Sequence, residues 1–80
     1  MIKLRLKDLT EEYVEYFYYP HGVETFGVIR GDLKTGEAAA VSVTQADRPV
    51  AYYAHKACRG VERLLQEENA PPQEDTIAWH

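Results

Sequence analysis

The chain opens with a strict alternation of apolar and basic residues. The segment Ile2–Lys7 reads Ile-Lys-Leu-Arg-Leu-Lys, and a period of two is typical of a β-strand with one face on a core and the other in water. After polar residues 8–11, β-branched and aromatic residues dominate positions 12–19, which predicts a second strand. Because successive side chains of a strand point to opposite faces, the aromatic rings of this strand should lie on both faces of the sheet.

The residues after the second strand predict a tight hairpin. Tyr19–Gly22 reads Tyr-Pro-His-Gly, in which the proline suits a type I turn and the glycine can adopt a left-handed backbone. We therefore expect a three-residue loop closed by a β-bulge. In this register the facing pairs on one side of the sheet are Tyr16 with Phe26 and Val14 with Val28, and on the other side Tyr13 with Ile29 and Phe17 with Thr25.

A second hairpin, Asp32–Glu37, decides which face of the fourth strand meets the core. We expect a four-residue loop at 33–36, in which Asp32 accepts backbone hydrogen bonds and Gly36 takes the left-handed position. Val41 then faces Val28, Val43 faces Phe26, and both valines lie beneath the helix. A three-residue loop would put both valines on the side of Ile29, because a shift of one residue reverses the face.

From position 50 the apolar period becomes helical. Apolar residues recur at spacings of three and four, at Val50, Ala54, Ala57, Val61 and Leu64, which predicts an amphipathic helix. Asp47 is the expected N-cap, Pro49 fits the first turn, and Asn69 with the prolines at 71 and 72 should end the helix. Gly60, with Ala54 and Ala57 on neighbouring turns, should let the helix lie close to the sheet.

Residues 76–79 predict a short fifth strand, and the whole chain then forms one domain, residues 1–80. If the helix crosses the face that carries Val14, the last strand pairs antiparallel with the first, and the sheet order is 5-1-2-3-4. The predicted fold class is α+β: a four-stranded antiparallel meander, one amphipathic helix packed on one sheet face, and a short C-terminal fifth strand.

The composition restricts the cellular location and the classes of binding partner that we expect. The 80 residues contain one cysteine, Cys58, so an internal disulfide is excluded, and the chain has neither a secretion signal nor an apolar run of the ~20 residues that span a bilayer. We therefore expect a cytoplasmic protein without a membrane partner. A net charge of −4 argues against a protein whose main task is to bind nucleic acid.

One helix covers only one face of the sheet, so the other face should be open. An apolar patch on a small monomer usually marks a contact site, and we expect this face to bind a protein partner or a second copy of the chain. In the alternative arrangement, the terminal residues or the loop at 44–48 fold over the patch, or its tyrosines lie beneath the stems of lysine and arginine side chains. The expected interaction surface consists of Lys3, Arg5, Lys7, Tyr13, Phe17, Tyr19 and Ile29.

The alternative for the same face is single-stranded nucleic acid. Bases would stack on Tyr13, Phe17 and Tyr19 while the basic residues of the first strand meet phosphates. The acidic residues at 11, 12 and 15, together with the net charge, count against this alternative.

Candidates for catalysis or metal binding are weak. His55, Cys58 and Glu62 lie on overlapping helix turns, but zinc needs three or four ligands, and no second cysteine or HxxxH pair supplies them. We expect Cys58 to be a small buried residue, His55 a surface residue and Glu62 part of a solvated face. We therefore expect no enzyme activity, no cofactor and no metal.

Several motifs together resemble a group of short proteins from Gram-positive bacteria that have no known activity. The shared motifs are the hairpin at 18–22, the turn at 32–37, the Tyr-x-x-His segment at 52–55 and Trp79 near the end of the chain. Two positions depart from that pattern: His80 replaces a final aromatic residue, and Lys56 separates His55 from Ala57. The resemblance implies no activity and directs attention to His55 and Trp79.

Overall fold

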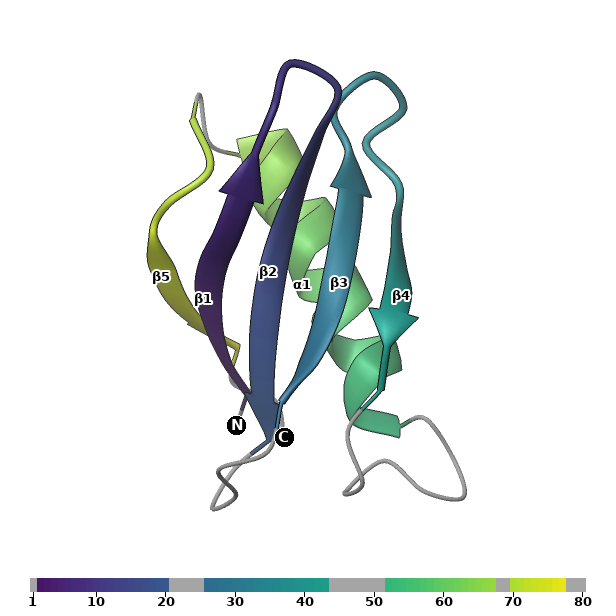
Figure 1. The fold of residues 1–80 in the computed structure, drawn as a ribbon, viewed down its shortest axis with the longest axis vertical. Coiled ribbons are helices and arrows are strands. Elements are labelled where there is room, and N and C mark those ends of the chain that lie inside the picture. Colours follow the sequence, from purple (N-terminus) through teal and green to yellow (C-terminus); the bar gives the residue numbers. More distant parts are fainter. Residues whose placement is uncertain (1, 21–25, 44–51, 68–69, 78–80) are drawn as a thin grey trace.

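Five strands form one antiparallel sheet and one helix crosses one of its faces, within the residues that the computed structural model describes: 2–20, 26–43, 52–67 and 70–77 (Figure 1). The predicted fold class is confirmed, and so is the order of strands in the sheet, β4-β3-β2-β1-β5. The elements are β1 (Ile2–Leu9), β2 (Tyr13–Pro20), β3 (Gly27–Asp32), β4 (Ala38–Ser42), α1 (Tyr52–Glu67) and β5 (Glu74–Ile77).

The core lies between α1 and the sheet. The predicted helical stripe is confirmed from Ala54 to Leu64, whereas Asp47, Pro49, Val50 and Asn69 lie outside the described residues. No helix in the described part of the chain is long and apolar enough to cross a membrane. The buried apolar residues of this core are Ile2, Leu4, Val14, Tyr16, Tyr18, Ile29, Ala54, Ala57, Val61 and Leu64.

The last strand closes the sheet next to the first. Ile2 lies opposite Ile77, and Arg5 lies opposite Glu74, so β5 begins two residues earlier than predicted and is described only as far as position 77. Gly60 faces Ile77 so closely that a Cβ at this position would collide with the end of the isoleucine side chain. The close approach that we expected from Gly60 therefore occurs, and it is an approach to β5.

The register of the first hairpin differs from the prediction. Tyr16 lies opposite Ile29 and Phe17 opposite Val28, a shift of three positions from the expected partners. Because this shift is odd, it reverses the faces of β3: Ile29 enters the core, while Phe26 and Val28 move to the face away from the helix. The connection between the last facing pair, Tyr18 and Gly27, is longer than the predicted three-residue loop, which costs little additional entropy, and the shifted register buries Ile29 completely.

The predicted loop of the second hairpin is confirmed. The N–H of Asp32 donates to the Glu37 carbonyl at 2.8 Å, and the Asp32 carboxylate accepts from the N–H of Lys34 at 2.8 Å and of Thr35 at 3.2 Å. Gly36 has a φ of 80°, the left-handed conformation that glycine adopts without steric cost.

A β-bulge in β4 separates the two valines. Ile29 lies opposite Ala40 but Val28 lies opposite Ser42, so Val41 is an extra residue in the strand. Val41 is 55% exposed, and its predicted position beneath the helix is wrong because the shifted register of the first hairpin places the Val28 side of β3, and Val41 with it, on the face away from the helix. Val43 packs against the core as expected, although Val28 and Phe26 are not its neighbours on that face.

Candidate functional site

The sheet face turned away from α1, here called the open face, is the candidate site, and it faces the viewer in Figure 1. The structure brings most of the predicted interaction residues together there, because Lys3 lies opposite Tyr19 and Arg5 opposite Phe17, while their neighbours in sequence are buried in the core. The prediction of Ile29 as an interaction residue is wrong. Its side chain is fully buried under the helix because the register of the first hairpin is shifted.

Three aromatic rings gather at one end of the open face. The ring centroids of Phe17 and Phe26 are 4.8 Å apart in an edge-to-face arrangement, and that of Tyr19 lies 5.7 Å from Phe26 and 6.5 Å from Phe17. Phe26 is 50% exposed. We call Phe17, Tyr19 and Phe26 the aromatic cluster.

Phe26 is the member that sequence reasoning missed, because the assumed tight turn put it in the core. The alternation of Phe26, Val28 and Arg30 was the available signal. Val28 lies opposite Phe17 and is only 8% exposed. The cluster therefore lies beside a well-packed part of the sheet, with Phe17 and Tyr19 on β2 and Phe26 directly before β3.

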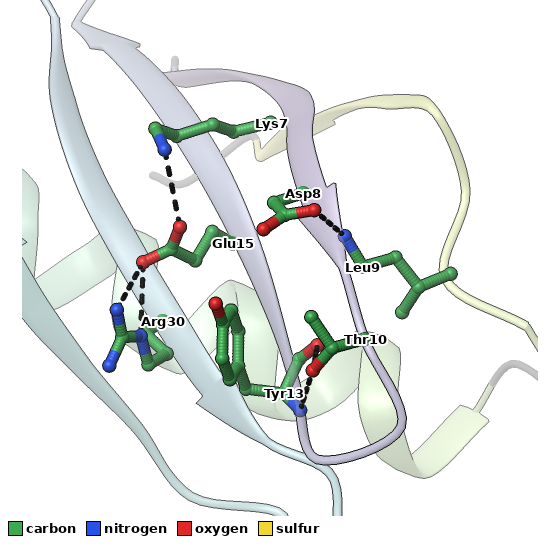
Figure 2. A network of polar contacts seen from close by, with 7 residues as sticks. All are labelled: Lys7, Asp8, Leu9, Thr10, Tyr13, Glu15 and Arg30. Carbon is green, nitrogen blue, oxygen red and sulfur yellow. Dashed lines mark hydrogen bonds and ion pairs between the residues drawn. The ribbon is translucent and has the colours of Figure 1, made fainter.

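A charged network occupies the other end of the open face (Figure 2). The Glu15 carboxylate accepts hydrogen bonds from Arg30 Nε at 3.0 Å and Nη2 at 2.8 Å, and from Lys7 Nζ at 3.3 Å. The Arg30 guanidinium also lies 4.4 Å from the centroid of the Tyr13 ring, a cation–π contact. Glu15 is only 5% exposed although no helix covers this face, so its neighbours provide the cover.

Two local features place the members of this network. In β1, Leu6 lies opposite Tyr16 but Asp8 lies opposite Glu15, so Lys7 is the extra residue of a β-bulge and both Lys7 and Asp8 are close to Glu15. At the start of β2, the Thr10 hydroxyl accepts a hydrogen bond from the N–H of Tyr13 at 3.0 Å.

The network is electrostatically self-compensating. The hydrogen bond from Arg30 lowers the pKa of Glu15 most strongly, Lys7 lowers it further, and burial opposes both effects. The same hydrogen bond raises the pKa of Arg30. Glu15 is therefore ionised near neutral pH and poorly suited to proton transfer, so we interpret the network as a structural support for the face.

The helix residues considered for chemistry do not form a site. Burial raises the pKa of the Cys58 thiol to about 11, with a smaller effect from Glu62, so the thiol is protonated near neutral pH and a poor nucleophile or metal ligand. Glu62 is not simply solvated: it accepts a hydrogen bond from the Ala38 N–H at 3.0 Å.

The other residues considered for catalysis or metal binding do not form a site in the described part of the chain either. His55 is exposed, and the described ranges contain no group of three or more His, Cys, Asp or Glu side chains placed to bind a metal. His21, Trp79 and His80 lie outside the described residues.

The aromatic cluster, bordered by Lys3 and Arg5, is thus the part of the open face whose chemistry suits recognition. The chain matches no protein-family model, and comparisons with curated proteins and with solved structures gave no significant match.

Proposed function

We propose that this protein is an interaction module that binds a protein partner through the aromatic cluster on its open face. The observation that carries the proposal is the contact of Phe17, Tyr19 and half-exposed Phe26 on the sheet face opposite the helix. Exposed aromatic side chains that cluster on a small domain are typical of the centres of protein interfaces.

The cluster needs little ordering before it binds. Phe17 and Tyr19 belong to β2, and the ring of Phe26, the residue before β3, packs against both. Side chains already fixed by strands and by ring contacts lose little conformational entropy on association, which favours affinity. Arg5 lies directly opposite Phe17, and arginine beside aromatic residues is the common composition of interface hot spots.

The charges favour a different protein over a second copy of this chain. Lys3 and Arg5 border the cluster on β1 and are exposed, whereas the chain as a whole carries −4. Two copies facing each other through the cluster would bring these like charges together, which is unfavourable. The partner that fits presents apolar side chains to the rings and acidic side chains to Lys3 and Arg5.

Selection of peptides tests this preference directly. A random peptide library is panned against the full chain, and the selected peptides are measured by fluorescence polarisation. We expect aromatic or aliphatic residues with acidic neighbours, and we expect Phe26→Ser and Arg5→Glu each to weaken binding about tenfold or more, as loss of a hot-spot residue does. Tyr52→Ser is the matched control, because Tyr52 is 47% exposed but belongs to the helix.

Two other binding partners of the open face, a second copy of the chain and a nucleic acid, are tested by further measurements. Either result would contradict the proposal of a different protein as partner. Light scattering at two protein concentrations that shows a dimer sensitive to Phe26→Ser would indicate self-association. Salt-sensitive binding of a short single-stranded oligonucleotide, lost in Phe17→Ser, would indicate nucleic acid, because bases stack on aromatic side chains beside basic ones. Peptides whose binding does not change in Phe26→Ser or Arg5→Glu would also contradict it.

A further inference from the structure

A groove lies between α1 and β5, on the helix side of the sheet and so on the opposite face from the aromatic cluster; α1 lies behind the sheet in Figure 1. Its volume is about 530 Å³, within the range of small-molecule sites. Leu64, Gly60 and Ile77 provide apolar lining. The basic side chains that line it are His55, Lys56, Arg59 and Arg63.

The basic residues form one stripe along the helix. Residues 55, 59 and 63 are four positions apart, so their side chains lie above one another on consecutive turns. Lys56 stands three positions before Arg59 and belongs to the same side. The stripe extends over about 12 Å of helix axis. Glu62, three positions after Arg59, borders the stripe, but it does not line the groove and its carboxylate binds the Ala38 N–H of β4.

These cations lack anionic partners within the described part of the chain. The ion pairs there are those of Glu15 with Lys7 and Arg30, and none involves Lys56, Arg59 or Arg63. The Lys56 ammonium lies 5.8 Å from the centroid of the Tyr52 ring, a cation–π contact that does not neutralise its positive charge. A groove lined by unpaired cations, in a chain with a net charge of −4, attracts anions locally.

The groove also contains two carboxylates, Glu67 on the helix turn after Arg63 and Asp75 on β5. Ile77, which touches Gly60, lies opposite Ile2, whereas Asp75 lies opposite Leu4, further along the sheet. Glu67 is the last residue of α1. The Asp75 carboxylate also accepts a hydrogen bond from the Thr76 N–H at 2.8 Å. Arg59, the residue before Gly60, therefore lies beside the contact of Gly60 with Ile77.

We propose that this groove binds a small organic phosphate, with the phosphate monoester at Arg59, Arg63 and Lys56 and the apolar body of the ligand against Ile77 and Leu64. A phosphate monoester carries up to two negative charges and several acceptor oxygens. It can therefore engage two guanidinium groups and an ammonium together, which a single carboxylate cannot do as well. The imidazole of His55 adds a further N–H donor at the edge of the groove.

Strand addition by an acidic peptide fits this groove less well. A peptide that extends the sheet needs free backbone donors and acceptors on the edge strand. In β5 the N–H of Thr76 is already bound by the Asp75 carboxylate. A carboxylate at that edge would in addition repel acidic side chains of an incoming strand.

The test is a titration of the ¹⁵N-labelled full chain at low salt with adenosine 5′-monophosphate, inorganic phosphate, adenosine and a hexaglutamate peptide. We expect saturable amide shifts at 55–64 and 74–77 with the nucleotide, weaker ones with inorganic phosphate, and none with adenosine. The double variant Arg59→Gln/Arg63→Gln should weaken nucleotide binding about tenfold or more, because it removes charge-assisted hydrogen bonds.

Controls separate this site from the open face. Lys34→Gln removes an exposed positive charge from a distant loop and should leave the affinity for the nucleotide within about twofold, as expected for a screened surface charge. Phe26→Ser, which should abolish peptide binding at the open face, should also leave it unchanged. No saturable shift at the groove, an equal affinity in Arg59→Gln/Arg63→Gln, or tighter binding of hexaglutamate than of the nucleotide would overturn the phosphate proposal.

Discussion

The Glu62 carboxylate accepts a hydrogen bond from the N–H of Ala38 at 3.0 Å, and it ties the middle of α1 to the first residue of β4. β4 is a terminal strand of the sheet, where backbone donors can lack partners. Glu62 therefore joins two elements that are 24 positions apart in the chain.

Replacing Glu62 with alanine should destabilise the protein by about 1–2 kcal/mol, because the Ala38 N–H loses a charged acceptor. Urea titration, which gives the free energy of unfolding, measures this loss of stability. Glu67→Ala removes an exposed carboxylate one turn further on and serves as the control, with a change below about 0.5 kcal/mol. Equal effects of the two substitutions would contradict the role given to the hydrogen bond.

Tyr16 contributes a second long-range hydrogen bond. Its hydroxyl donates to the Pro72 carbonyl at 2.6 Å, and the ring is fully buried. Tyr16→Phe should lower the free energy of unfolding by about 1–2 kcal/mol, since a carbonyl loses its donor and the ring itself remains. Tyr19→Phe, on a half-buried ring of the open face, should change stability by less than about 0.5 kcal/mol. An unchanged free energy of unfolding in Tyr16→Phe would show that the Pro72 carbonyl finds another donor.

The charged network predicts a particular dependence on pH. Because the pKa of Glu15 is lowered from 4.5 in the folded protein, its contribution is fully present above about pH 4.5 and is lost as the pH falls through the lower, folded-state value. Glu15→Gln should therefore reduce stability at pH 7 by about 1 kcal/mol, a modest value because Lys7 and Arg30 are partly exposed.

The comparison that checks this is urea unfolding of both proteins between pH 3 and pH 7. The difference in the free energy of unfolding between wild type and Glu15→Gln should become smaller toward pH 3. Glu12→Gln, at an exposed position, should follow the wild-type curve. A constant difference across the range would show that Glu15 acts through packing and not through its charge.

Cys58 should be protected from alkylation by its chemistry as well as by burial. Its pKa of about 11 lies about 2 units above the ordinary 9.0, so at pH 8 the folded protein contains about 100-fold less thiolate than the unfolded chain. Iodoacetamide labelling followed by mass spectrometry should be slower in buffer than in urea by at least that factor. The neutral thiol also favours folding below pH 9.0, an effect lost as the pH rises through about 11. Equal labelling rates would refute the assignment.

Two glycines should respond differently to alanine. A Cβ on Gly27 would meet the Tyr18 ring and the Ser42 carbonyl oxygen, so Gly27→Ala should cost about 3 kcal/mol through overpacking. Gly36, with a φ of 80°, has open space around it, and Gly36→Ala should cost only the left-handed backbone strain of about 1 kcal/mol. Thermal unfolding ranks the two variants, and a reversed order would contradict the packing at Gly27.

Local signals predicted much of this fold. The alternation in β1, the spacing in α1 and the loop at Asp32 and Gly36 each act over a few residues, and the structure confirms all three. The order of the strands followed from these elements because one helix had to cover one apolar face.

The first hairpin could not be predicted from its turn residues. Its register depends on which of Phe26 and Ile29 is buried, and that choice is made by packing against the helix and not by the turn. The same applies to Glu62 and Tyr16, whose partners are distant in sequence, and to the groove, which needs the relative position of α1 and β5. Six of the seven predicted interaction residues share the open face. The prediction for the seventh, Ile29, is wrong because the predicted register of the first hairpin is wrong.

The pairing of Ile2 with Ile77 has a consequence for chain connectivity. Residues opposite each other in an antiparallel ladder have Cα atoms about 5 Å apart, so the described ends of the polypeptide meet within the sheet. A short linker could close the backbone into a ring, and the exposed turn at Lys34 offers a place to open it again. Circular permutation should therefore preserve the sheet while β1 and β5 become a hairpin.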